Sequence, residues 1–91
     1  MKTDKYSFTK TGWDDFLYWI QNDKKMVGKI DALLKDIIRN GLMSGIGKPE
    51  ALKGDKAGLF SRRITDKHRL VYRIESDTLI VASCRDHYDD T

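Results

Sequence analysis

The sequence predicts an α+β domain in which two N-terminal helices pack as an antiparallel pair on an antiparallel β-sheet. Two observations support this class. Apolar residues recur at helical spacing in two stretches of the first 40 residues, and after Gly58 the spacing changes to two, which is typical of strands. A chain of 91 residues has the length of one small domain, so we expect residues 1–91 to share a single core.

The first two expected elements are a short strand and a helix. Residues 5–9 alternate between polar and apolar side chains, as strands do. Residues 11–22 predict a helix, with Thr11 as its N-cap and Asp14 three residues later in a capping-box arrangement. The expected apolar face follows the i, i+3, i+4, i+7 pattern and consists of Trp13, Phe16, Leu17 and Ile20.

The second helix has the clearest pattern in the chain. We expect it over residues 23–41, with Asp23 as N-cap and Gly41 as the residue that ends it. Its apolar stripe is continuous and consists of Met26, Val27, Ile30, Leu33, Leu34, Ile37 and Ile38. Both stripes are interpreted as core, and the short link between the helices indicates an antiparallel pair.

A long glycine-rich connection separates the helices from the sheet. It runs from Gly41 to Gly58, and connections of this length in small domains are usually functional or disordered. Its GIGKPE stretch lacks the spacing of a phosphate-binding loop and follows no strand, so that function is rejected. Three strands are expected next, over residues 59–64, 68–74 and 78–84, with turns at 65–67 and 75–77.

The first of these turns brings two arginines together. If residues 65–67 form the turn, Ile64 pairs with His68 and Arg63 lies directly opposite Arg69. Like charges in opposite positions destabilise a sheet, so an anion is expected beside them. A two-residue turn would shift the register and separate the pair.

Strand alternation gives the following strand an outward face with two arginines, Arg69 and Arg73, on either side of Val71. Guanidinium groups form paired, charge-assisted hydrogen bonds with phosphate, so this face suits a nucleic-acid backbone. The alternative is that the arginines only keep the face soluble.

The charge distribution agrees with a polyanionic partner. Residues 48–73 hold eight basic and three acidic residues, a net charge of +5, whereas the rest of the chain carries −2. The single cysteine, Cys84, cannot form an internal disulfide, and no apolar run approaches membrane-spanning length. We therefore expect a cytoplasmic protein with no membrane partner.

The chain ends in CRDHYDDT, which has three interpretations: a metal site, a solvated acidic tail, or part of an active site. One cysteine, His87 and the distant His68 do not have recognised ligand spacing, so no metal or other cofactor is expected. An imidazole titrates near neutral pH and can donate or accept a proton there. His87 is therefore a candidate acid or base.

Five motifs, WDDFLYW, GKPEALK, FSRRIT, HRLVY and ASCRDHY, occur in an order and spacing that resemble the YoeB/Txe toxins, in the RelE superfamily of type II toxin–antitoxin systems. The resemblance covers residues 6–88. It implies a fold like that of small microbial ribonucleases, with two helices on a curved antiparallel sheet. It also implies a ribosome-dependent endoribonuclease that cuts mRNA in the ribosomal A site and inhibits translation. The implied partners are a YefM/Axe-like antitoxin, the ribosome, mRNA and a second copy of the chain.

The resemblance also implies roles for individual residues. The general base would be Glu50, which takes the proton from the ribose 2′-OH, and the general acid His87, which protonates the 5′-oxygen leaving group. Arg69 would stabilise charge on the scissile phosphate. Substrate-binding roles would fall to Lys53, Arg62, Arg63 and Tyr88. The expected product has a 2′,3′-cyclic phosphate, and no metal takes part.

This chain departs from the family pattern in three ways, the first of which is about four extra residues before the first strand. Lys67 stands where an acidic residue is common, and Asp89, Asp90 and Thr91 extend beyond the usual end. Two other functions compete with the nuclease: a ParE-like toxin that binds DNA gyrase, and an RNA-binding regulator without catalysis. The joint presence of Glu50, Arg69 and His87 favours the nuclease.

Overall fold

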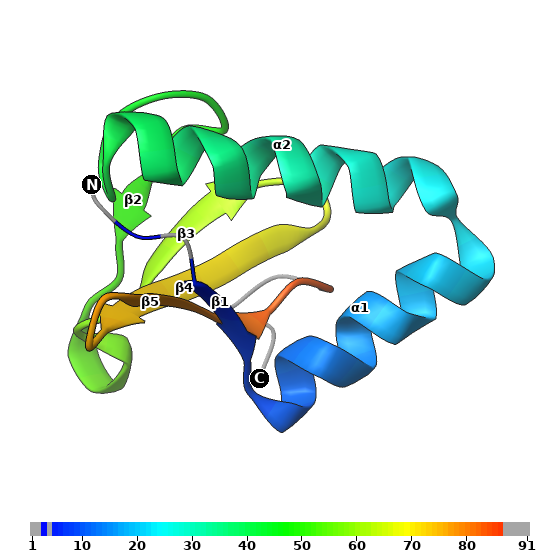
Figure 1. Ribbon diagram of the computed structural model, residues 1–91, viewed down its shortest axis with the longest axis horizontal. Coiled ribbons are helices and arrows are strands. Elements are labelled where there is room, and N and C mark those ends of the chain that lie inside the picture. Colours follow the sequence, from blue (N-terminus) through cyan, green and yellow to red (C-terminus); the bar gives the residue numbers. More distant parts are fainter. Residues whose placement is uncertain (1–2, 4, 87–91) are drawn as a thin grey trace.

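The computed structural model describes residue 3 and residues 5–86, and its helices lie on a five-stranded sheet (Figure 1). The elements are β1 (Lys5–Phe8), α1 (Lys10–Asn22), α2 (Lys24–Asn40), β2 (Glu50–Ala51), a 3₁₀ turn (Gly54–Lys56), β3 (Phe60–Arg63), β4 (Arg69–Glu75) and β5 (Thr78–Ser83). The strand order is β1-β5-β4-β3-β2. Within the described residues, neither helix combines the length and the apolar character that crossing a membrane requires.

The predicted fold class is confirmed, with one difference in the sheet. β2, β3, β4 and β5 pair in antiparallel fashion, as expected, but β1 joins β5 in parallel, with Lys5 beside Thr78 and Phe8 beside Val81. A hairpin imposes an antiparallel direction, whereas strands at opposite ends of a chain are under no such constraint. The sheet is therefore mixed, with β1 and β2 at its edges and β3, β4 and β5 inside it.

Helix α1 begins two residues earlier than expected. Its N-cap is Thr9, whose Oγ1 accepts a hydrogen bond of 3.1 Å from the amide of Gly12, so the prediction of Thr11 as the cap is wrong. The amide of Thr9 also donates to the carbonyl of Val81, at 3.0 Å. Pairing with β5 therefore decides where the strand ends and the helix begins.

The buried face of α1 also differs from the predicted one. Gly12 and Trp19 are buried, whereas Trp13 and Ile20 are 46% and 39% exposed. A Cβ atom on Gly12 would lie 2.3 Å from the carbonyl oxygen of Val81, so the helix approaches β5 more closely than any side chain would allow. That close approach rotates the apolar stripe away from the one predicted by spacing.

Helix α2 agrees with its prediction. Asp23 caps it by accepting from the amide of Lys25 at 3.1 Å, and Gly41 ends it with a φ of 95°. Asp23 is also the only link to α1, and the two helices diverge from it as a V rather than lying side by side (Figure 1). The buried core combines both helices with the sheet and consists of Trp19, Met26, Ile30, Leu33, Leu34, Ile37, Ile64, Leu70, Tyr72, Leu79, Val81 and Cys84.

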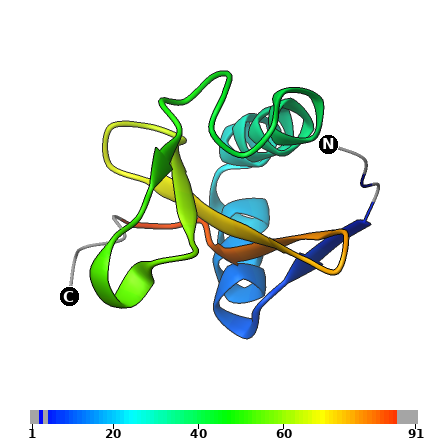
Figure 2. The ribbon, with the colours of Figure 1, turned by 90° about the vertical axis from the view of Figure 1, so that its left-hand side faces the viewer.

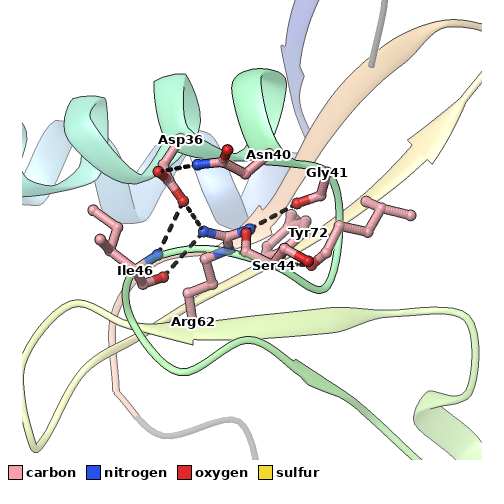
Figure 3. A network of polar contacts seen from close by, with 8 residues as sticks. Asp36, Asn40, Gly41, Ser44, Ile46, Arg62 and Tyr72 are labelled. Carbon is pink, nitrogen blue, oxygen red and sulfur yellow. Dashed lines mark hydrogen bonds and ion pairs between the residues drawn. The ribbon is translucent and has the colours of Figure 1, made fainter.

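A buried arginine holds the connection that follows α2 (Figure 3). The guanidinium of Arg62 is fully buried and pairs with Asp36 of α2 at 2.5 Å. It also donates to the carbonyls of three loop residues, Gly41, Ser44 and Ile46, at 2.7, 2.6 and 3.0 Å. Loop carbonyls buried without a donor would be costly, and one side chain satisfies several of them.

Two neighbours complete this network. The Nε of Arg62 donates to the hydroxyl of Tyr72 at 3.0 Å, and that hydroxyl donates to the carbonyl of Leu42 at 2.6 Å. Asp36 also accepts from the amide of Ile46 and from the side chain of Asn40. The hydrogen bond from Arg62 holds the pKa of the Asp36 carboxyl below its usual value, against the opposing effect of burial.

These contacts overturn one sequence-based prediction. Arg62 was expected to bind substrate, but all five of its N–H groups have acceptors inside the protein and its side chain is not exposed. The sequence motif contains two adjacent arginines, and alternation along β3 turns only Arg63 outward. Arg62 is therefore a structural residue.

Replacing Arg62 by lysine should destabilise the fold by about 2–4 kcal/mol, because lysine has fewer donors and leaves buried acceptors without partners. The measurement is the free energy of unfolding from urea titration. The matched control is Arg63→Lys at the exposed neighbouring position, which should change it by less than about 0.5 kcal/mol. Equal unfolding midpoints for the two variants would contradict the structural role of Arg62.

Candidate active site

The strand register gathers three of the predicted site residues on one face of the sheet. Glu50 in β2 lies opposite Ser61 in β3, and two residues further along β3 Arg63 lies opposite Arg69 in β4. Residues in opposite positions share a face, as do alternate residues of one strand. Glu50, Arg63 and Arg69 therefore share the face that points away from the core side chains of Arg62 and Tyr72.

The predicted pairing of the two arginines is confirmed. The amide of Ile64 donates to the carbonyl of His68 at 2.9 Å, so the turn is the three-residue one and Arg63 is the Cα partner of Arg69. The hydroxyl of Thr65 accepts from the amides of Lys67 and His68, at 3.2 and 3.1 Å, and stabilises this turn. The strand register therefore sets two positively charged residues, Arg63 and Arg69, in opposite positions.

Arg69 is more recessed than expected. The outward face of β4 was predicted to be open, but Arg69 is 8% exposed and Val71 4%. Leu52 and Ser61, which share this face by alternation, are also buried, so the face has a small buried layer of its own. The prediction that this face of β4 is exposed to solvent is therefore wrong at Arg69 and at Val71.

The side chain of Arg69 is held from one side. Its Nη1 atom donates to the carbonyls of Thr65 and Asp66, at 2.8 and 3.0 Å. Both bonds use Nη1, so the Nε–Nη2 edge, which arginine also uses for paired bonds to an oxyanion, is not involved in them. A guanidinium held in this way does not need to reorganise when it meets a negative charge.

The remaining predicted site residues fall into two groups. Glu50, Lys53 and Arg63 are exposed, Lys53 immediately before the 3₁₀ turn. The backbone amide of Arg63 donates to the carbonyl of Gly47 at 2.7 Å, which ties β3 to the loop that precedes Glu50. His87 and Tyr88 lie outside the described residues.

The last described residues, 84–86, are fixed to α1. The amide of Cys84 donates to Oδ2 of Asp15 at 3.0 Å, and its carbonyl accepts from Nε1 of Trp19 at 2.8 Å. The guanidinium of Arg85 lies 3.6 Å from the ring centre of Tyr18. Asp15, Tyr18 and Trp19 lie at i, i+3 and i+4, on one side of the helix.

The same residues are also fixed to the start of β4. The amide of Asp86 donates to Nδ1 of His68 at 2.8 Å, and its carbonyl accepts from the amide of Arg69 at 3.1 Å. The His68 ring packs edge-on against Trp19, with ring centres 4.8 Å apart. We call Asp15, Trp19 and His68 together the tail anchor.

Burial changes the titration of two anchor residues. It raises the pKa of the Asp15 carboxyl above its usual value, opposed by the hydrogen bond from the Cys84 amide and by the charge of Arg85. It lowers the pKa of His68 below 6.5, against the charge of Asp86 and with the charges of Lys67 and Arg85. The imidazole of His68 is therefore neutral at neutral pH, as an acceptor at Nδ1 must be.

Sequence reasoning missed the tail anchor. From the sequence alone, His68 is excluded as a metal ligand and receives no functional role, and neither Asp15 nor Trp19 is connected with the end of the chain. Their spacing on α1 contains no signal for this contact, since the partners lie 69 and 65 positions away in the sequence. Only the packing of α1 on β5 brings them together.

Comparison with known proteins identifies the family. The family model described as the YoeB-like toxin of bacterial type II toxin–antitoxin systems matches residues 8–88. The chain belongs to this family. A relative, Toxin YoeB of Escherichia coli K12, is 49% identical over 84 residues, which cover 92% of this chain and 99% of the relative.

Solved structures of YoeB-like toxins have the same fold. The heterotetrameric YoeB–YefM toxin–antitoxin complex of Staphylococcus aureus contains a chain that superposes with a TM-score of 0.86 at 48% identity, covering 97% of this chain and 100% of that one. The YoeB dimer from Staphylococcus aureus also superposes with a TM-score of 0.86, at 50% identity, covering 92% of this chain and 97% of that one. The protein is a toxin of a type II toxin–antitoxin system.

The Cys84 thiol is expected to be inert in the folded toxin, because burial raises its pKa from 9.0 to about 12. At pH 8 an aromatic disulfide reagent should leave the native protein unmodified and react with one thiol after unfolding in urea. An exposed cysteine introduced as Ser76→Cys is the positive control. Rapid modification of native wild-type protein would contradict the buried position of Cys84.

The same raised pKa gives a dependence of stability on pH. The contribution of the Cys84 thiol is complete below pH 9 and is lost as the pH rises toward about 12, because ionisation is easier in the unfolded chain. Urea midpoints of wild type and Cys84→Ala should therefore converge over that range. Lysines and tyrosines generally titrate in the same pH range, but they are the same in both proteins, so their effect cancels in the difference between the two urea midpoints.

Proposed function

We propose that this toxin is a ribosome-dependent endoribonuclease that cuts mRNA in the ribosomal A site and thereby inhibits translation. The observation that carries the proposal is the register that sets a carboxylate residue, Glu50, on the same sheet face as the arginine pair Arg63 and Arg69. RNA supplies its own nucleophile, the ribose 2′-OH. The protein then has to supply a base, an acid and positive charge at the phosphate.

Each of these requirements has a candidate residue. Glu50 takes the proton from the 2′-OH, and His87 protonates the departing 5′-oxygen, so the products are a 2′,3′-cyclic phosphate and a 5′-hydroxyl. Positioned acids and bases each contribute about 10²–10⁴-fold to the rate. The described residues hold Glu50 on the two-residue strand β2, which is directly paired with β3.

Positive charge at the phosphate comes from Arg69, with Arg63 assisting. The confirmed pairing of the two arginines supports this, because like charges in opposite positions of a sheet are unfavourable until an anion binds. Electrostatic stabilisation by prearranged donors is commonly the largest contribution to such reactions. Lys53 contacts the RNA backbone, and Tyr88 orients the substrate by stacking on a base, which is worth about 1–3 kcal/mol.

We also infer a YefM-like antitoxin as the partner that neutralises the toxin. The support is the relative from Staphylococcus aureus, which is seen as a YoeB–YefM complex and matches nearly all of this chain. A second copy of the chain is a further partner, supported by the YoeB dimer of the same organism. Function in translation assigns the toxin to the cytoplasm.

The decisive test is to map cleavage of a defined mRNA in a purified translation system, with and without ribosomes. We expect ribosome-dependent cuts at the A-site codon with cyclic phosphate ends. Glu50→Gln and His87→Gln should each lower the cleavage rate by about 10²–10⁴-fold. Intact mRNA together with inhibited DNA gyrase would contradict the nuclease and favour the ParE-like alternative.

The arginine assignment has its own matched control. Arg69→Lys should reduce the cleavage rate by about 10²-fold or more, since lysine cannot donate two parallel bonds to the phosphate. Arg73→Lys, four residues further along the same strand and paired with Glu75 at 3.6 Å, should cleave at the wild-type rate. Both substitutions keep the positive charge, so equal losses in the two variants would contradict a specific site for paired hydrogen bonds at Arg69.

A further inference from the structure

The end of the described chain has an unusual backbone conformation. Asp86 has a φ of 64°, in the left-handed region that residues with a side chain seldom adopt. Such conformations persist where surrounding contacts hold them, and they concentrate at functional sites. Here two hydrogen bonds hold Asp86, one from its amide to His68 and one to its carbonyl from the amide of Arg69.

We propose that His68 is a positioning residue of the toxin, which fixes the backbone conformation of Asp86, the residue directly before the proposed general acid His87. This inference rests on the proposed nuclease function. His87 follows Asp86 directly in the chain. The amide of Asp86 is hydrogen-bonded to His68, and its carbonyl is hydrogen-bonded to the amide of Arg69.

The three-residue segment 84–86 has few other ways to move. Trp19 and Asp15 hold its first residue through the two backbone atoms of Cys84, at 2.8 and 3.0 Å. With that end fixed, the bond from Asp86 to His68 decides which way the chain leaves the sheet. Without the hydrogen bond to His68, the φ of Asp86 can return to the more common negative region. A displacement of about 1 Å at a reacting group can reduce a rate by about 100-fold.

The contact requires a neutral imidazole. A protonated Nδ1 is a donor and would face the donor amide of Asp86. The charged and titratable groups around His68 are Lys67 in its own turn, Arg69 beside it, Arg85 and Asp86 on the tail, and Asp15 behind Trp19. Acidification below pH 6.5, through the lowered pKa of His68, therefore removes this hydrogen bond to Asp86.

The test uses two substitutions that differ in one acceptor. The side-chain oxygen of asparagine occupies nearly the place of Nδ1, so His68→Asn keeps the acceptor without titrating, whereas His68→Leu removes it. We expect His68→Leu to lower kcat by about tenfold to 100-fold with little change in KM, and His68→Asn to restore most of kcat. The ratio of His68→Asn to wild-type activity should rise as the pH falls below 6.5.

A measurement without RNA accompanies the assay. Amide hydrogen exchange at Asp86 should be about three- to tenfold faster in His68→Leu than in wild type, as for the loss of one hydrogen bond, and slow again in His68→Asn. The His68 ring of wild type should carry its proton on Nε2 in nitrogen NMR. Circular dichroism establishes that both variants are folded.

The outcomes separate the two proposals. Absence of mRNA cleavage by the wild type overturns the proposed function. Wild-type cleavage with an unchanged kcat in folded His68→Leu overturns the positioning role alone. A loss of kcat that His68→Asn does not restore, with equal Asp86 exchange in both variants, also overturns it, because the acceptor at Nδ1 would then be irrelevant.

Discussion

The buried guanidinium of Arg62 is the contact on which the edge of this sheet depends. The chain between α2 and β2 has no regular structure of its own, and its carbonyls need donors. Arg62 and Tyr72 supply them from neighbouring strands, and Asp36 binds the same group from α2. Gly45 fits this arrangement because a Cβ atom there would overlap the carboxylate of Asp36. The loop therefore delivers Glu50 to the sheet from a fixed position.

The chain that follows β5, orange to red in Figure 2, is held at the other end of the site by a second set of contacts. The tail anchor holds residues 84–86 between α1 and the start of β4, while the β3–β4 turn holds Arg69 through its carbonyls. The loop before Glu50 and the tail are thus fixed by hydrogen bonds to their backbone from side chains that do not themselves belong to the proposed chemistry. Prearrangement of this kind is what acid–base catalysis without a metal requires.

The pairing of Arg63 with Arg69 is a feature of the sheet that stability alone does not explain. A sheet built only for stability would not set Arg63 opposite Arg69. The sequence predicts this register on the condition of a three-residue turn, and the folded chain has that turn. The recessed position of Arg69 was not predictable, because the buried layer around Leu52, Ser61 and Val71 forms only when β2 pairs with β3. Alternation along β3 turns Arg62 and Arg63 to opposite faces, but it does not show that Arg62 meets five acceptors inside the protein.

Local patterns in the sequence predict helix α2 with both of its ends, the three consecutive strands and, for a three-residue turn, the arginine pair. These features depend on periodicity, capping and turn chemistry, which act over a few residues. The order and spacing of five motifs indicate the toxin family. The cap and buried face of α1, the parallel addition of β1, the interior position of Arg62 and the tail anchor arose only in the folded molecule. Each of them depends on contacts between segments far apart in sequence, such as Asp15 with Cys84, and no local pattern records which distant backbone group a side chain will meet.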